Sequence, residues 1–122
     1  RTKTLTVANV GDTRCVMSVG GSAQDLSQDH RLTRSDERQR CEAAGAPIMR
    51  DRIHGMLAVT RTFGDRMYKD LGPRNSIVVS TPEIQSEVVT KDSEFIIMAT
   101  DGIWDVLDSQ EAVNFVRLKL KQ

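Results

Sequence analysis

The sequence predicts an α+β domain in which short antiparallel strands outnumber the helices. Most apolar segments are short, alternate with polar residues and are separated by tight turns, which is typical of antiparallel sheet. Two segments instead have helical spacing, one inside the chain and one near its end. The 122 residues, of which 39% are hydrophobic, correspond to one domain or to a part of one.

The N-terminal residues are predicted to form three strands. Thr4–Val10 alternates and is rich in β-branched residues. Gly11–Arg14 has the composition of a turn, so Cys15–Val19 is expected to return beside the first strand. Gly20–Gly21 is typical of a hairpin turn, and residues 22–27 are expected to add a short strand.

A helix is predicted from about Asp36 to Ala44, where the apolar period changes. Thr33 and Asp36 have the spacing of a capping box, with Thr33 as the N-cap. Gly45 and Pro47 are end signals, because glycine suits the left-handed cap and proline cannot continue a helix.

The middle of the chain has weaker signals. Residues 47–59 indicate short strands around a turn near His54–Gly55, and residues 60–76 indicate a loop with one helical turn. A strand is predicted at 76–80. Ile84–Val89 alternates like a half-exposed strand, and Glu94–Thr100 is continuously apolar in its middle. That pattern predicts a strand that is covered on both faces.

A second helix is expected from Asp108 to Leu120. Asp108 or Ser109 caps it, and Glu111 completes a capping box if Asp108 is the cap. Trp104 is expected to pack against this helix. The apolar stripe of the helix consists of Ala112, Val113, Val116 and Leu120.

Charge and composition exclude several classes of function. Lys plus Arg and Asp plus Glu number 17 each, without a basic stripe, so neither nucleic acid nor a membrane is expected as a partner. No apolar stretch approaches the roughly 20 residues of a membrane span. Cys15 and Cys41 can form one disulfide, but buried thiols in a cytoplasmic or nuclear protein are the preferred interpretation.

Two aspartates follow the last predicted strand. Asp101 ends the apolar run and Asp105 comes four residues later, after Gly102. Oxygen ligands of this kind suit Mg²⁺ or Mn²⁺. Locally, however, Asp101–Gly102 is also a hairpin signal and Asp105 also a helix cap, while Asp12 after Gly11 has turn character. Taken alone, these positions favour the turn interpretation.

Six stretches together change that balance. They are residues 7–17, 26–31, 36–48, 52–65, 81–84 and 94–117. In their order and spacing these stretches resemble the protein phosphatase 2C family, the metal-dependent protein serine/threonine phosphatases, across essentially the whole chain.

The resemblance implies part of an αββα sandwich, in which two antiparallel sheets are flanked by helices and which is incomplete at both ends. It implies hydrolysis of phosphoserine and phosphothreonine in phosphoprotein substrates through metal-activated water, with two catalytic Mg²⁺ or Mn²⁺ ions and a third, weaker site. Asp101 matches the aspartate that binds the catalytic metals, and Asp12 and Asp105 join it around the third ion. Gly11 and Gly102 would allow close backbone approach.

The resemblance also implies a flap-like segment at residues 31–53 beside the active site. Its charge run at 34–40 is interpreted as a solvated helix face. In the stretch "TRTFGD", Thr60 stands where the family often has serine, and Arg61 and Asp65 are expected to have structural roles near the site.

Some motifs of the family are missing from this sequence. It contains neither the early Asp-Gly-His tripeptide nor the late Asp-Asn pair, which supply further metal ligands in the family. The chain is therefore expected to be the middle-to-late portion of a catalytic domain, with little activity alone. The remainder of the domain, or self-association, is expected to cover its open sheet edges.

Two other hypotheses remain. The first is a non-catalytic, phosphatase-like regulatory or interaction module. The second is a plain α+β binding domain in which the aspartates are only turn residues.

Overall fold

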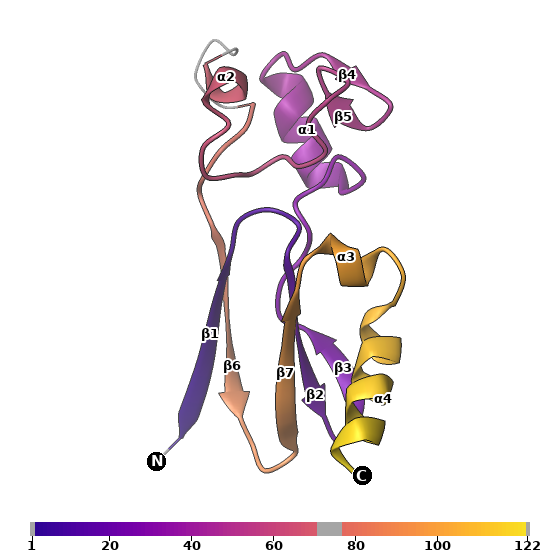
Figure 1. The fold of residues 1–122 in the computed structure, drawn as a ribbon. Helices are drawn as coiled ribbons and strands as arrows, with labels where there is room; N and C mark the ends of the chain where they lie inside the picture. Colours follow the sequence, from indigo (N-terminus) through magenta and orange to yellow (C-terminus); the bar gives the residue numbers. More distant parts are fainter. Residues whose placement is uncertain (1, 71–76, 122) are drawn as a thin grey trace. The chain divides into compact units, whose positions relative to one another are not determined.

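The computed structural model describes residues 2–70 and 77–121, and the chain divides into two compact units (Figure 1). Unit 1 comprises Arg1–Asn9, Thr13–Gln28 and Glu83–Gln122, and unit 2 comprises Val10–Asp12 and Asp29–Pro82. Both α-helices and antiparallel sheets are present, which confirms the α+β prediction. No helix among the described residues is long and apolar enough to cross a membrane.

Unit 1 contains two antiparallel sheets. In one sheet, β1 (Lys3–Asn9) pairs with β6 (Glu83–Val89). In the other, β2 (Arg14–Val19) lies between β3 (Ser22–Asp25) and β7 (Ser93–Ala99). These five strands were all predicted from their alternation or apolar runs.

The pairing of β1 corrects one prediction. β2 was expected to return beside β1, but the two strands belong to different sheets, and β1 pairs with β6 from Lys3↔Val89 to Asn9↔Glu83. The reason lies in the apolar faces of the strands. Leu5 and Val7 of β1 pack against the cluster of Cys15, Met17 and Leu26, so the two strands meet face to face across a core instead of edge to edge.

β2 is the central strand of unit 1, because both of its faces are buried. Cys15 and Met17 face the other sheet, whereas Val16 packs with Trp104 and Val113 on the opposite side. That side is covered by the helices α3 (Asp101–Trp104) and α4 (Ser109–Leu120), and Figure 1 shows α4 running alongside the three-stranded sheet. Unit 1 thus has a sheet–sheet–helix layering.

β7 does not have the two covered faces that its sequence predicted. Phe95 and Ile97 pack towards the helices, but Ile96 and Met98 are 44% and 65% exposed. Since β7 is an edge strand of the described sheet, a continuous apolar run here marks one covered face and one uncovered face.

The second predicted helix is confirmed as α4, and Asp108 is its N-cap. The Glu111 amide donates to Asp108 Oδ1 at 2.7 Å, and the Asp108 amide donates to Glu111 Oε2 at 2.8 Å, so the expected capping box is present. Of the predicted stripe, Ala112 and Val113 are buried, whereas Leu120 is 70% exposed. Trp104 packs in the same cluster, as predicted.

Unit 2 is built around α1 (Ser35–Ala43), which confirms the first predicted helix within a residue. The predicted capping box is wrong. The N-cap is Arg34 and makes no side-chain cap, and Asp36 instead accepts two hydrogen bonds from the Arg34 guanidinium at 2.7 and 2.8 Å. A charged partner two residues away competes with the helix end for this carboxylate.

The rest of unit 2 consists of short elements. β4 (Ile48–Met49) and β5 (Arg52–Ile53) form the small hairpin, and α2 (Arg66–Lys69) is the expected helical turn. The hairpin turn lies at Arg50–Asp51, where both residues have positive φ, and a second turn follows at the predicted position, His54–Gly55.

The strand predicted at 76–80 is wrong for the part that the structure describes, and Ser76 lies outside the described residues. Ile77 and Val78 are buried with Leu32 and Tyr68 in the core of unit 2. Only Val79 makes a β-bridge, to Arg61. The apolar run therefore reflects the burial of an irregular segment. A short apolar run in the sequence looks the same whether the buried segment is a strand or irregular.

Both cysteines are free and buried, as predicted. Cys15 belongs to unit 1 and Cys41 to unit 2. Burial raises the pKa of each thiol above its usual value, which keeps the thiols protonated and unreactive.

Gly21 provides the first testable prediction. Its φ is +87°, and a Cβ there would lie 2.5 Å from Arg117 Nη1. Arg117 cannot move away without loss, because its guanidinium binds Glu94 at 2.9 Å and Glu94 also accepts from Ser18 at 2.6 Å. We expect Gly21→Ala to lower the free energy of unfolding by about 1–3 kcal/mol, as measured by urea denaturation.

The matched control is Gly20→Ala, at a position that has positive φ but nothing within 4 Å of the added Cβ. Equal losses in both variants would show that strain in φ alone, without the Arg117 contact, is responsible.

Candidate functional site

Asp101 and Asp105 lie one helical turn apart, directly after the strand β7. Thr100 is the N-cap of α3, and the Asp105 amide donates to the Asp101 carbonyl at 2.8 Å. Residues four apart share a helix face, and both side chains are exposed. The end of β7 therefore presents two carboxylates on one side of a short helix.

α3 is fixed to the sheet by Trp104. The indole Nε1 donates to the carbonyl of Ala99 at 2.7 Å, and the Arg14 guanidinium lies 5.1 Å from the centre of the ring. Asp101–Gly102 is thus the start of a helix, and the local hairpin interpretation is wrong. At Gly102 a Cβ would meet only Thr100 Oγ1 at 3.8 Å, an ordinary contact, so the close approach expected at this glycine is not present.

Asp12 belongs to unit 2, on a loop that is held by a buried histidine. The Gly11 amide donates to Nδ1 of His30, and the His30 amide donates to the Gly11 carbonyl, both at 3.0 Å. His30 is fully buried. Gly11 has a φ of +106°, a conformation that favours glycine. The backbone that carries Asp12 is therefore well defined.

The Asp12 carboxylate makes an ion pair. Arg31 donates to Oδ2 of Asp12 from Nε at 2.9 Å and from Nη2 at 2.7 Å. The Asp12 side chain is 21% exposed and the Arg31 side chain 32% exposed. A cation at Asp12 would share this carboxylate with a guanidinium.

The fit of these residues to a divalent ion is partial. Two carboxylates one turn apart supply oxygen donors of the kind that Mg²⁺ takes together with several waters. Within residues 2–70 and 77–121, however, no group of three or more His, Cys, Asp or Glu side chains is placed to hold a metal. The ligand roles of Asp101, Asp12 and Asp105 remain predictions.

A second set of charged residues, which sequence reasoning missed, is centred on Glu37 in unit 2. Glu37 is 2% exposed. Its carboxylate accepts hydrogen bonds from Arg61 at 2.6 Å, from Thr60 at 2.5 Å and from Arg40 at 2.9 Å. Burial alone raises the pKa of Glu37, but the bonds from Arg61, Thr60 and Arg40 outweigh it and lower the pKa to about 2.

The Glu37 contacts correct the interpretation of residues 34–40 as a solvated face. Glu37 shares the buried side of α1 with Cys41 and Ala44, and the spacing i, i+4, i+7 was a signal that could have revealed it. Arg40 also turns inward to Glu37, whereas Asp36 and Arg38 lie at the surface. Arg38 pairs there with Glu42 and Asp51.

Arg61 and Arg40 connect Glu37 to the segment before β6. Its Nη1 donates to the carbonyl of Thr81 at 3.0 Å, while Arg40 donates to the carbonyl of Ile77 at 2.9 Å. Asp65 is the N-cap of α2 and has a φ of +47°, and its backbone carbonyl accepts from the Tyr68 amide at 2.9 Å. That Arg61 and Asp65 lie beside a reaction site remains a prediction.

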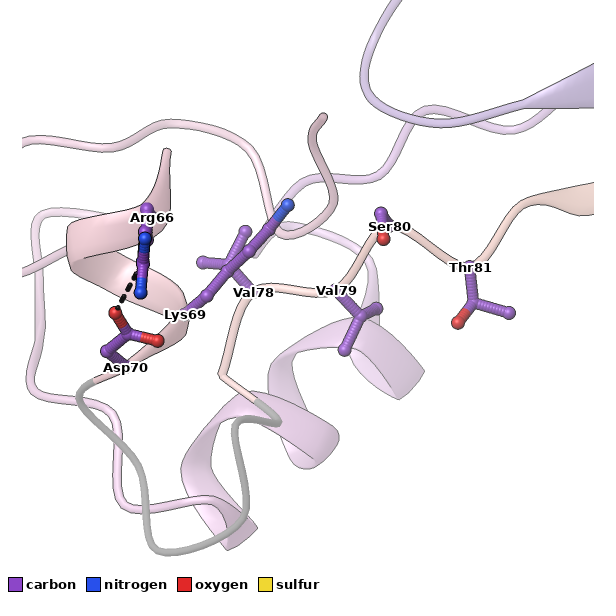
Figure 2. A pocket seen from close by; sticks show the side chains of 7 residues that line it. All are labelled: Arg66, Lys69, Asp70, Val78, Val79, Ser80 and Thr81. Atoms are coloured by element: carbon purple, nitrogen blue, oxygen red, sulfur yellow. Dashed lines mark hydrogen bonds and ion pairs between the residues drawn. The ribbon is translucent and has the colours of Figure 1, made fainter. Parts of the chain in front are cut away.

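Unit 2 also contains a pocket of about 370 Å³, formed by α2 and the segment before β6 (Figure 2). It is lined by Arg66, Lys69, Asp70, Val78, Val79, Ser80 and Thr81.

Comparison with known proteins gives the class of the chain. The sequence profile of protein phosphatase 2C matches residues 1–122. The chain belongs to the protein phosphatase 2C family, as its six motif stretches indicated.

Two relatives show the extent of the match. "Probable protein phosphatase 2C 59" of Arabidopsis thaliana is 48% identical over 116 residues, which are 93% of this chain and 35% of that protein. "Protein phosphatase 1G" of Rattus norvegicus is 41% identical over 126 residues, covering 100% of this chain and 23% of that protein. The chain thus spans about a third or less of these relatives.

Solved structures have the same fold. A phosphatase from Toxoplasma gondii has a TM-score of 0.85 at 25% identity, over 97% of this chain and 38% of its own. A sex-determining protein of C. elegans has a TM-score of 0.80 at 23% identity, over 93% and 28%. These similarities confirm the predicted fold class.

Glu37 provides the second testable prediction. We expect Glu37→Gln to lower the free energy of unfolding at pH 7 by about 3 kcal/mol, because two guanidinium groups lose their buried partner. In the parent chain the pKa falls from 4.5 to about 2 on folding. The stabilisation is therefore complete above about pH 4.5 and is lost as the pH falls towards 2. Urea denaturation between pH 2 and pH 7 measures both effects.

The control for Glu37 is Glu42→Gln on the same helix. Glu42 is 51% exposed and pairs only at the surface with Arg38, so its loss should cost less than about 1 kcal/mol. Equal effects of the two variants, or an unchanged pH dependence in Glu37→Gln, would contradict the assignment.

Proposed function

We propose that this chain is part of a protein serine/threonine phosphatase that depends on Mg²⁺ or Mn²⁺ and hydrolyses phosphoserine and phosphothreonine in phosphoprotein substrates. The observation that carries the proposal is the family match over residues 1–122, together with two carboxylates one turn apart at the end of β7. Names of relatives such as "Protein phosphatase 1G" support the reaction class.

Each aspartate has a role in this proposal. Asp101 would bind the catalytic ions from α3. Asp105 on the same helical turn and Asp12 on the loop that His30 holds would be ligands of the third, weaker ion together with Asp101, as the family resemblance implies. Divalent cations, when bound, acidify water and offset the charge of phosphoryl oxygens. The chain contributes orientation: Trp104 fixes α3 to β7 through the carbonyl of Ala99, so the backbone that carries the two aspartates is in place before an ion binds.

The remainder of the phosphatase domain is proposed as the partner of unit 1. Several large apolar side chains are exposed on it, which a stable fold normally covers. They include Ile84, Val88, Met98, Phe115 and Leu118, each at least 53% exposed. Alternatively, self-association of the isolated chain would cover these apolar side chains.

A hybrid protein tests the proposed function. The chain replaces the matching stretch of the 48% identical Arabidopsis relative, so that the rest of the domain is supplied. We expect the folded hybrid to hydrolyse a phosphothreonine peptide with Mn²⁺. Asp101→Asn should lower kcat at least about 100-fold, since one carboxylate ligand is lost. The control is Asp92→Asn, an exposed aspartate in the turn before β7.

A folded hybrid without turnover would overturn the proposal and favour a non-catalytic module. A second assay measures hydrolysis of an aryl phosphate by the isolated chain with Mn²⁺, and we expect little turnover. Turnover that is lost with Asp101→Asn and with chelator would mean that a second copy of the chain supplies the missing carboxylates.

A further inference from the structure

The pocket in unit 2 is separate from the proposed metal ligands in its residues and in its chemistry (Figure 2). α2 contributes the cations Arg66 and Lys69, and Asp70 follows them. The opposite wall contributes the exposed hydroxyl residues Ser80 and Thr81. The pocket thus combines positive charge on one wall with hydroxyl groups on the other.

Both walls are bonded to Thr62, and Arg61 adds a second bond to the hydroxyl wall. Lys69 Nζ donates to the carbonyl of Thr62 at 2.8 Å, and the Thr62 amide donates to the carbonyl of Val79 at 3.0 Å. Arg61, which Glu37 holds, donates to the carbonyl of Thr81 at 3.0 Å. The walls are therefore positioned before any ligand arrives, which lowers the entropy cost of binding.

The two cations can bind a ligand without breaking a strong interaction. Arg66 pairs with Asp70 at 3.3 Å, with the side chains 92% and 57% exposed, and such surface ion pairs stabilise little. Lys69 has one bond to the Thr62 carbonyl, and an ammonium group carries further N–H donors. The hydroxyl groups of Ser80 and Thr81 can add neutral donors.

We propose that this pocket binds the phosphate monoester of a phosphorylated peptide. A phosphate dianion balances Arg66 and Lys69, and its three terminal oxygens can accept from guanidinium, ammonium and hydroxyl donors together. The volume of about 370 Å³ is at the lower end of ligand sites, which suits one phosphorylated side chain. Val79, partly exposed, offers an apolar contact to the carbon atoms of that side chain.

That the phosphate belongs to a peptide rests on the proposed function, because a protein phosphatase binds phosphorylated protein segments. The pocket would hold a phosphorylated residue without hydrolysing it, since its described lining residues include no pair of carboxylates.

The test is a binding titration of the ¹⁵N-labelled chain with a phosphothreonine peptide, in chelator so that no metal-dependent hydrolysis occurs. We expect amide shifts at 66–70 and 78–81, and binding at least about tenfold weaker for the unphosphorylated peptide. Lys69→Gln should weaken binding about fivefold or more, whereas Asp70→Asn should tighten it about twofold because a like charge is removed. Arg66→Gln changes a side chain that is 92% exposed and so tests the site without risk to the fold.

The matched control is Lys91→Gln, an exposed lysine in the turn between β6 and β7 of unit 1. An equal loss in this variant would show non-specific attraction and would overturn the proposal. If inorganic phosphate binds as tightly as the phosphopeptide, the proposal that the ligand is a peptide is wrong. If the amide shifts are confined to other residues, the proposed location of the site is wrong. Since the titration contains no metal and measures no turnover, its failure leaves the proposed phosphatase activity intact, and an inactive hybrid leaves the pocket intact.

Discussion

The buried carboxylate of Glu37 is the interaction on which unit 2 depends. A carboxylate that is 2% exposed is costly to bury unless donors replace its water, and Arg61, Arg40 and Thr60 provide them. The same guanidinium groups continue to the carbonyls of Thr81 and Ile77. One carboxylate thereby connects helix α1 with the irregular segment that forms one wall of the pocket proposed to bind phosphate, so the same contacts hold the core and that wall.

Unit 1 depends on β2 instead, which is buried on both faces. Its two faces take part in different clusters, one with β1 and one with α3 and α4. Because Trp104 of α3 belongs to the second cluster and bonds to the end of β7, the position of Asp101 follows from core packing. The carboxylates themselves lie at the surface, where a ligand can reach them without a cost to the core.

Local signals predicted the elements well and their partners poorly. The strands that alternate, the helix near 36–44 and the Asp108–Glu111 capping box depend on neighbours in the chain, and each is present. The pairing of β1 with β6, the irregular path of Ile77 and Val78, and the burial of Glu37 depend on residues more than 20 positions away. In the candidate site, the sequence predicted Asp101 and Asp105 near each other because they are four residues apart. Arg31 as the partner of Asp12 left no comparable local signal.

The sequence by itself determined the family, the order of the elements and the residue types that can hold a divalent ion, because motifs, periodicity and carboxylate chemistry are properties of the chain. Only the tertiary structure decided which strands share a sheet, which acidic residue of α1 is buried and which cations line a pocket together with Ser80 and Thr81. The physical reason is that burial and pairing are settled by competition among distant segments for the same core and the same donors, and the outcome is visible only when all of them are in place.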